Sequence, residues 1–226
     1  NLRDHPQVHV YFRTRSQLVP NRNHRFNQHV LRYTASGSGL RNDIYVHPIG
    51  HGVPAGRNSA YSIESCKTSA GFGMVACLYL AEAAGCLGLR SSDPTVQPYL
   101  DYKYLESEFD RSRMREAVRL CIEIAGQESM ANIIESCIDP TESDLETDDS
   151  LNEWLLVNAQ TSHHISGTCK MGPDSDPMSV VDQYLKVKGV EGLRVADASI
   201  MPDCIRANTN ATTTVSYTHL TLPTKA

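Results

Sequence analysis

The sequence predicts an α+β fold in which an antiparallel sheet is backed by helices. Apolar residues between Met114 and Ala125 recur at helical spacing, so they share one face of a helix. Other segments are only as long as a strand and are apolar or alternate between apolar and polar residues. These helical and strand segments do not follow the strict β-α-β order of a complete doubly wound domain, which favours α+β over α/β.

The N-terminal part of the chain is expected to supply most of the sheet. Residues 8–12 and 43–47 have the length and composition of strands, and Pro48 should end the second of them. Two further apolar runs, at 74–80 and 85–90, flank a turn of small residues. This arrangement predicts a β-hairpin.

Three helices are expected in the middle of the chain. The first contains residues 114–125, with Asp110 as its candidate N-cap. A shorter helix is predicted from Met130 to Ile138, followed by an acidic, turn-rich linker over 139–149. Residues 150–153 read S-L-N-E, which is the spacing of a capping box and predicts the start of a third helix.

The C-terminal part of the chain is expected to contain little regular structure. Residues 185–187 and 193–197 are candidate short strands separated by a glycine turn, and the second is apolar enough to be buried. Residues 215–226 contain Pro223 and many threonines, which are poor helix formers. We expect 215–226 to be a non-native tail and leave it out of the fold prediction.

Composition and charge disfavour several classes of protein. The chain has 226 residues, 40% hydrophobic and 21% charged, which is ordinary for a globular protein. Its net charge of -5 does not provide the positive field that binding to nucleic acid or an anionic membrane requires. No apolar run approaches the roughly 20 residues of a membrane span, and no targeting signal is recognisable.

The cysteines indicate reduced thiols. Their number is odd, and no pair has the C-x-x-C spacing of a zinc site or redox motif, which argues against a disulfide framework and against a structural metal. Reduced thiols favour a cytoplasmic location. The seven are Cys66, Cys77, Cys86, Cys121, Cys137, Cys169 and Cys204.

Three segments near the C-terminus contain residues suited to chemistry. Residues 162–172 place two histidines before a loop of small residues, and a neutral imidazole is the usual general base near pH 7. Residues 193–199 form an apolar run that ends in an aspartate, and residues 208–212 carry two asparagines. Taken alone, each segment is better explained by structural histidines, helix capping or turn formation than by chemistry.

The order of these segments resembles the C-terminal signature of the glucose-methanol-choline (GMC) oxidoreductases, including choline dehydrogenase-like and alcohol oxidase-like members. The matching positions are H-x-x-G-T-C-x-M-G at 164–172, the run from Val180 to Pro202, and N-x-N-A at 208–211. The first residues, N-L-R-D-H-P at 1–6, are similar to the N-L-x-D-H-P at which family members enter the substrate-binding domain.

The resemblance implies a division of the chain by function. Residues 1–155 would form part of a substrate-binding domain, and 156–214 would complete a domain that binds FAD. The G-x-G-x-x-G turn that holds the pyrophosphate in such domains is absent from this sequence, so the dinucleotide-binding half is expected to be missing. A protein of these residues alone should bind FAD poorly and be inactive.

The resemblance also implies an activity, namely the oxidation of a small-molecule alcohol to an aldehyde or ketone by hydride transfer to flavin N5. His164 would be the base that takes the hydroxyl proton. Asn208 would be its companion, forming a hydrogen bond to the developing alkoxide. Asn210 would lie close to the flavin as a binding residue.

Other matched positions are expected to bind the cofactor or line the pocket. Asp197 would form hydrogen bonds to the ribityl chain, and the small Ala198 would let the backbone approach the pyrophosphate. His163 would line the substrate pocket, and His5 is expected to be structural.

Two alternatives to this function stay open at this point. The first is a non-redox lyase of the same fold that holds FAD. The second is a metal-dependent hydrolase using His163, His164 and a carboxylate, although adjacent residues of a strand point to opposite faces and no metal site is otherwise indicated. The sequence leaves open the alcohol, the electron acceptor and the oligomeric state.

Overall fold

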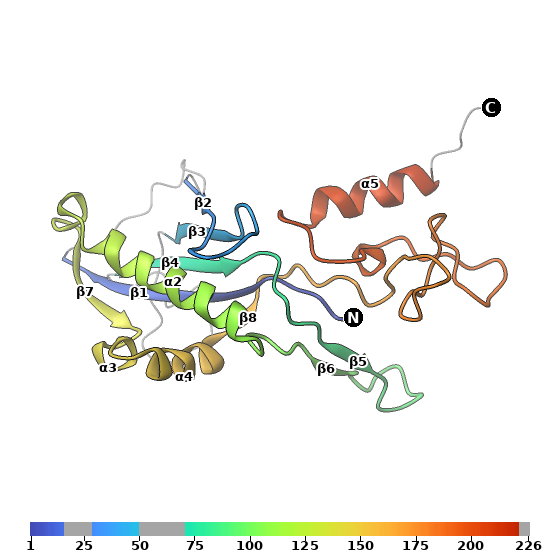
Figure 1. Ribbon diagram of the computed structural model, residues 1–226, viewed down its shortest axis with the longest axis horizontal. Coiled ribbons are helices and arrows are strands. Elements are labelled where there is room, and N and C mark those ends of the chain that lie inside the picture. The colour runs from blue at the N-terminus through green and yellow to red at the C-terminus, as the bar shows by residue number, and fades with distance from the viewer. Residues whose placement is uncertain (16–28, 50–70, 222–226) are drawn as a thin grey trace. The chain divides into compact units, whose positions relative to one another are not determined.

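The computed structural model describes residues 1–15, 29–49 and 71–221 (Figure 1). The chain forms two compact units, each of which is built from separate segments of sequence. The sheet unit comprises Pro6–Leu78 and Ser107–Gln160, and the loop unit comprises Asn1–His5, Tyr79–Glu106 and Thr161–Ala226. The division by function at residue 155 stays a prediction, because compactness says nothing about which part binds the cofactor.

An antiparallel sheet forms the centre of the sheet unit. Its strands lie in the order β2-β3-β4-β1-β7, and the short β8 also pairs with β1. The described strands are β1 (Pro6–Thr14), β2 (Leu31–Tyr33), β3 (Ile44–Ile49), β4 (Gly71–Leu78), β7 (Ile134–Asp139) and β8 (Gln160–Thr161). This confirms the predicted α+β fold with an antiparallel sheet and helices.

Helix α2 (Glu108–Ala125) packs on strands β4, β3 and β1 (Figure 1). The face predicted from sequence is the buried one, because Met114, Ala117, Val118 and Cys121 are all inaccessible to solvent. Alternate residues of β1, including Val8 and Val10, are buried as well. Burial of each large apolar side chain contributes about 1.5–3 kcal/mol, so this helix–sheet contact forms the core of the unit.

A buried ion network also joins α2 to the sheet. The Arg113 side chain is 1% exposed, and its guanidinium donates to the carboxylates of Asp43 at 2.9 Å and Asp110 at 2.6 Å. Its central carbon lies 4.0 Å from the centre of the Phe109 ring. Asp43 also accepts hydrogen bonds from the Ala35 amide and the Ser38 hydroxyl. The network therefore connects the loop before β3 to the first turns of the helix.

The strands predicted at 8–12 and 43–47 are confirmed as β1 and β3. The prediction that Pro48 ends its strand is wrong, because β3 continues to Ile49. Strand β2 pairs with β3 only as far as Val46, so Pro48 lies on a part of the strand that has no described neighbour on that side. An edge position of this kind tolerates a residue without an amide hydrogen.

The hairpin predicted between 74–80 and 85–90 is wrong. Strand β4 lies between β1 and β3, and nearly all of its residues are buried. The second run instead supplies β5 (Cys86–Gly88), which pairs with β6 (Tyr99–Asp101) in a separate two-stranded sheet. A strand made only of apolar residues is typically buried in the middle of a sheet, with a neighbouring strand on each side. A single hairpin partner would leave one of its edges unpaired.

The helix predictions need four corrections. Ser107 caps α2 by accepting from the Asp110 amide, whereas the predicted cap Asp110 lies inside the helix. Residues 130–138 form the end of a short 3-10 turn and strand β7 in place of a helix, and β7 pairs with β1.

The predicted acidic linker over 139–149 contains helix α3 (Glu142–Leu145). Helix α4 (Asp148–Asn158) is confirmed, but its capping box joins Thr147 to Ser150, three residues earlier than predicted.

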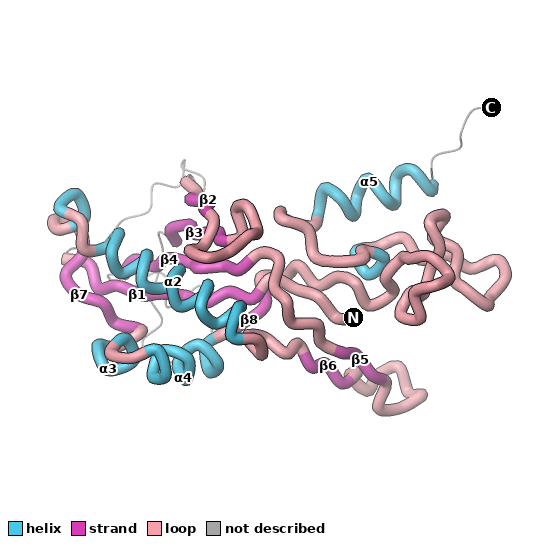
Figure 2. Tube along the Cα trace, in the orientation of Figure 1, coloured by secondary structure: helices cyan, strands magenta, loops and turns pink. Residues whose placement is uncertain are grey.

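The loop unit contains mostly turns and irregular segments between 162 and 209 (Figure 2). The strands predicted at 185–187 and 193–197 are reduced to isolated bridges, and Leu193 is 51% exposed, so the prediction that the second strand is buried is wrong. A 3-10 turn spans Ala198–Ile200.

Helix α5 spans Asn210–Thr221, so the poor helix formers after residue 214 are helical as far as residue 221. That residues 215–226 are a non-native tail stays a prediction. Hydroxyl groups of the helix donate to the carbonyl four residues earlier, which satisfies these hydroxyls without raising the low helix propensity of Thr and Ser. These donors are Thr213, Thr214, Ser216 and Thr218. Residues 222–226 lie outside the described part of the chain.

Candidate functional site

The first five residues of the chain hold the histidine segment in place within the loop unit. Arg3 and Ser166 exchange two backbone hydrogen bonds of 2.8 and 2.9 Å, and the Ser162 amide donates to the His5 carbonyl at 3.2 Å. This short antiparallel pairing sets the two segments side by side. It places Asp4 and His5 opposite His164.

Of the two ring nitrogens of His164, Nδ1 forms hydrogen bonds with described residues and Nε2 forms none. Its Nδ1 lies 3.0 Å from His5 Nδ1 and 2.9 Å from the Ser162 hydroxyl, and its backbone amide donates to the Asp4 carboxylate at 3.0 Å. No described residue forms a hydrogen bond to Nε2. The side chain is half-buried, so Nε2 is the atom through which it can act on a bound molecule.

His5 is fully buried, and its ring contacts His164, the Ile205 carbonyl and the Tyr79 ring. Its Nε2 lies 2.7 Å from the carbonyl oxygen of Ile205, and its ring packs 4.3 Å from that of Tyr79. The neighbouring Asp4 also accepts a hydrogen bond from the Tyr104 hydroxyl. The N-terminal segment therefore contacts all the other segments of this unit.

Burial lowers the pKa of His164, and the positive form of His163 lowers it further, while the Asp4 carboxylate acts in the opposite direction. Burial also lowers the pKa of His5 to about 4, and the charged form of His164 adds to this effect. Both imidazoles are therefore neutral near pH 7. A neutral imidazole is the form that can accept a proton.

This pKa shift predicts an acid-sensitive fold. Because His5 binds a proton less readily when folded, its contribution to stability is complete above pH 6.5 and is lost as the pH falls toward 4. The loss should reach on the order of 3 kcal/mol. Denaturant unfolding of the wild type and of His5→Gln at pH 7, 6, 5 and 4 measures it as the difference between the two proteins. Parallel pH curves for the two would contradict the prediction.

Backbone hydrogen bonds bring the second signature segment against the first. The Gly167 amide donates to the Ala198 carbonyl at 3.2 Å, and the Cys169 amide donates to the Ser199 carbonyl at 2.8 Å. Gly167 has φ +78°, and a Cβ there would lie 2.8–2.9 Å from atoms of Asn1. Glycine is therefore required at this close approach.

The aspartate of this segment has a local role in the structure. One carboxylate oxygen of Asp197 accepts from the Ser199 amide at 2.8 Å and caps the 3-10 turn that contains Ala198. The Asp197 side chain is exposed, and Ala198 is partly buried. Because the described hydrogen bond engages one carboxylate oxygen and the residue is exposed, Asp197 can form a further hydrogen bond to a ligand.

The third segment, residues 208–212, has no described hydrogen bond to the histidines, but the residues just before it contact the N-terminal and histidine segments. The Ile205 carbonyl contacts His5, and the Cys204 thiol lies 3.6 Å from the Ser166 hydroxyl. Asn208 and Asn210 are both exposed, and no described hydrogen bond links either side chain to His164. The structure thus joins the residues before this segment to His5 and leaves the side-chain amides of Asn208 and Asn210 exposed.

His163 is exposed and has a left-handed backbone conformation with φ +64°. Sequence reasoning did not assign functional positions to Asp4, His5, Ser162 and Tyr104. The N-L-R-D-H-P motif at 1–6 was the signal for the first two, and Ser162 begins the histidine segment 162–172. Nothing in the local sequence marked Tyr104.

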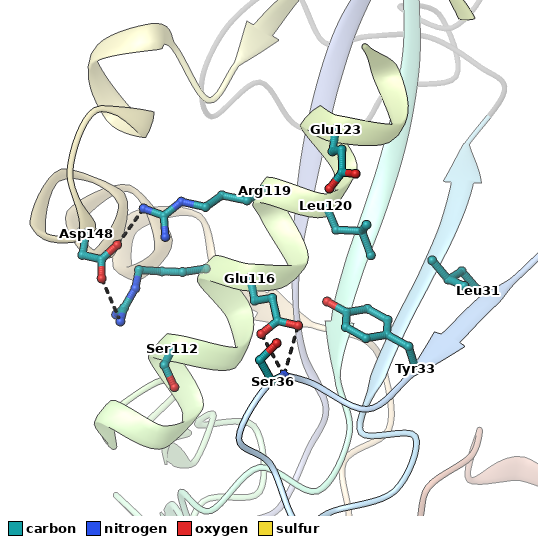
Figure 3. Close-up of a pocket in the computed structure, with 10 residues that line it drawn as sticks. Leu31, Tyr33, Ser36, Ser112, Glu116, Arg119, Leu120, Glu123 and Asp148 are labelled. Atoms are coloured by element: carbon teal, nitrogen blue, oxygen red, sulfur yellow. Dashed lines mark hydrogen bonds and ion pairs between the residues drawn. The ribbon is translucent and has the colours of Figure 1, made fainter. Parts of the chain in front are cut away.

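A surface pocket of about 630 Å³ lies elsewhere, in the sheet unit beside α2 (Figure 3). Glu116 accepts from the Ser36 amide, and Arg119 is paired with Asp148. The Tyr33 hydroxyl is buried and has no described hydrogen-bond partner. The pocket is lined by Leu31, Tyr33, Ser36, Ser112, Arg115, Glu116, Arg119, Leu120, Glu123 and Asp148. It contains no histidine and none of the signature residues, so we do not assign the reaction to it.

Within residues 1–15, 29–49 and 71–221, no three His, Cys, Asp or Glu side chains are grouped so that they could hold a metal ion. In the same ranges, no helix is both long enough and apolar enough to cross a membrane.

Two solved structures that match the fold of this chain are described as oxidases. Pyridoxine 4-oxidase from Mesorbium loti matches 97% of this chain with a TM-score of 0.83 and 22% identity, and the match covers 42% of that protein. A formate oxidase from Aspergillus oryzae, studied for the modification of its FAD, matches 97% of this chain with a TM-score of 0.79 and covers 46% of that protein. At such low identity these likenesses establish the fold.

Sequence comparisons identify the family. An oxygen-dependent choline dehydrogenase from Rhizobium rhizogenes is 38% identical over 151 residues, which is 67% of this chain and 27% of that protein. The mitochondrial choline dehydrogenase of Mus musculus is 42% identical over 133 residues, 59% of this chain and 22% of that protein. The chain thus spans about a quarter of the length of these relatives. The family model described as GMC oxidoreductase matches residues 81–216, and the chain belongs to this family.

Proposed function

We propose that the protein containing this chain is an FAD-dependent oxidoreductase that oxidises the CH–OH group of a small alcohol to an aldehyde or ketone. The observation that carries this proposal is the half-buried His164, whose Nδ1 is held by His5 and Ser162 while Nε2 has no described partner. Family membership and the choline dehydrogenases among the relatives support it. Choline is therefore the first substrate to test.

The loop unit has residues that fit a flavin. Asp197, Asn208 and Asn210 carry exposed polar side chains, and Ala198 presents no bulk beyond its methyl group. Asp197 would bind the ribityl chain, Ala198 would allow the pyrophosphate to approach, and Asn210 would lie near the flavin. FAD, when bound, supplies the acceptor for the hydride that leaves the alcohol carbon.

The chain's own residues would position the alcohol and move its proton. His164 would accept the hydroxyl proton at Nε2, and Asn208 would form a hydrogen bond to the oxygen as negative charge develops. His163 would line the substrate pocket. The described cysteines are free thiols, which supports a cytoplasmic location as part of the proposal.

The function is tested by expressing the complete reading frame that encodes this chain. We expect a yellow protein whose flavin absorbance is bleached anaerobically by choline or by a simple alcohol. A yellow protein that no alcohol bleaches would favour the non-redox lyase alternative. A colourless protein that does not take up added FAD would contradict the proposal.

A further inference from the structure

We propose that His5 sets the tautomer of His164, so that the lone pair of His164 is held at Nε2. The proposal concerns a chain of three groups, the Ile205 carbonyl, the His5 ring and the His164 ring, which are joined by contacts of 2.7 and 3.0 Å. It deepens the proposed function and rests on it only where it concerns the reaction.

The direction of each hydrogen bond follows from the carbonyl. A carbonyl oxygen can only accept, so the His5 Nε2 that lies 2.7 Å from Ile205 carries a hydrogen. A neutral imidazole has one hydrogen, which leaves His5 Nδ1 with a lone pair. Among the residues that the structure describes, the only group within hydrogen-bond distance that can donate to this lone pair is Nδ1 of His164, at 3.0 Å. His164 therefore carries its hydrogen on Nδ1 and has none on Nε2.

The alternative in which His5 is charged would reverse this result. An imidazolium at position 5 would donate from Nδ1, and His164 would then accept there and carry its hydrogen on Nε2. His5 is fully buried, and burial opposes its charged form. The Asp4 carboxylate lies nearby, but it already accepts from the amides of His5 and His164 and from the Tyr104 hydroxyl.

Ser162 cannot set the direction by itself. Its hydroxyl lies 2.9 Å from the same Nδ1 of His164, but a hydroxyl donates or accepts as its neighbour requires. When His164 Nδ1 carries the hydrogen, it donates a bifurcated hydrogen bond to His5 Nδ1 and to the Ser162 hydroxyl oxygen. The His5–Ile205 pair has a fixed direction and is therefore the group that decides.

This tautomer suits a base. The alcohol proton would be received at the bare Nε2, and the resulting imidazolium would keep its Nδ1 hydrogen in the bond to His5. No proton has to move within the pair before the alcohol reacts. His5 acts through His164 and is a positioning residue.

The tautomer can be measured by ¹⁵N NMR of the complete protein labelled at histidine, with the His164 signals assigned by their loss in His164→Gln. We expect the wild type to carry hydrogen on Nδ1 and none on Nε2. His5→Gln should retain this state, because its amide can donate to Ile205 and accept from His164. Ser162→Ala should retain it as well, whereas His5→Phe, which neither donates nor accepts, should shift His164 toward the Nε2–H form.

A second readout links the tautomer to the reaction. His5→Phe should lower kcat for alcohol oxidation by roughly one to two orders of magnitude, as loss of an orienting partner typically does, and His5→Gln should restore most of it. A wild-type His164 with hydrogen on Nε2 would overturn the proposal, whether or not His5→Phe folds. An Nδ1–H tautomer in a protein that oxidises no alcohol would leave the proposal standing and reject the proposed function.

Discussion

His164→Ala is expected to lower kcat/KM for alcohol oxidation by roughly two to four orders of magnitude, the usual contribution of a general base. In the proposed mechanism, the substitution removes the Nε2 that takes the hydroxyl proton of the alcohol. The backbone amide of residue 164 still donates to Asp4, so the fold of the loop unit should persist. Steady-state kinetics with choline, and flavin absorbance as a check on cofactor binding, measure the effect.

The adjacent histidine provides a matched comparison. His163 is exposed and its ring forms no hydrogen bond with a described residue, so His163→Ala should lower kcat/KM far less than His164→Ala. The acid limb of the wild-type pH profile should lie below pH 6.5, because the pKa of His164 is lowered by burial. Equal losses for the two alanine variants would show that neither histidine is the specific base.

Arg113→Met is expected to reduce the free energy of unfolding of the sheet unit by about 3–5 kcal/mol. Methionine fills similar space but leaves the carboxylates of Asp43 and Asp110 buried without their cation. An uncompensated buried charge costs far more than the lost attraction alone, because the charge has also lost its contact with water. Urea unfolding at pH 7, followed by fluorescence of the single tryptophan at position 154, measures the change.

A surface ion pair on the same helix is the control. Arg111 pairs with Glu108 at 2.9 Å, and the glutamate side chain is 60% exposed. Exposed pairs contribute at most about 1 kcal/mol, so Arg111→Ala should have a much smaller effect than Arg113→Met. If Arg113→Met is combined with Asp43→Asn and Asp110→Asn, part of the stability should return. Similar midpoints for Arg111→Ala and Arg113→Met would contradict the importance of the buried network.

The fold could be predicted from sequence where local patterns decide it. The alternation in 8–12 and the helical spacing in 114–125 each concern residues close in the chain, and both elements are present. The partner of β4 could not be read in this way, because its neighbours β1 and β3 are distant in sequence. Residues 130–138 contain isoleucines compatible with either period, and pairing with β1 made them a strand.

The same distinction holds for the site. The signature motif made His164 a candidate because its residues are contiguous, and the carry-over of its role stays a prediction. The contact that engages His164 comes from His5, 159 residues away. No periodicity or capping rule connects positions at that distance, so His5 was expected only to be structural.

The composition of the loop unit has a consequence for biosynthesis. Its three segments are separated by those of the sheet unit, so residues 1–5 and 79–106 leave the ribosome before the residues that they contact in 161–226. Contacts of such long sequence separation form slowly, and domains generally fold as their chains become available. Nascent chains that stop before Ile205 would therefore lack the carbonyl that engages His5. Assembly of the histidine pair should be a late event of synthesis, which ribosome-bound chains of increasing length would reveal.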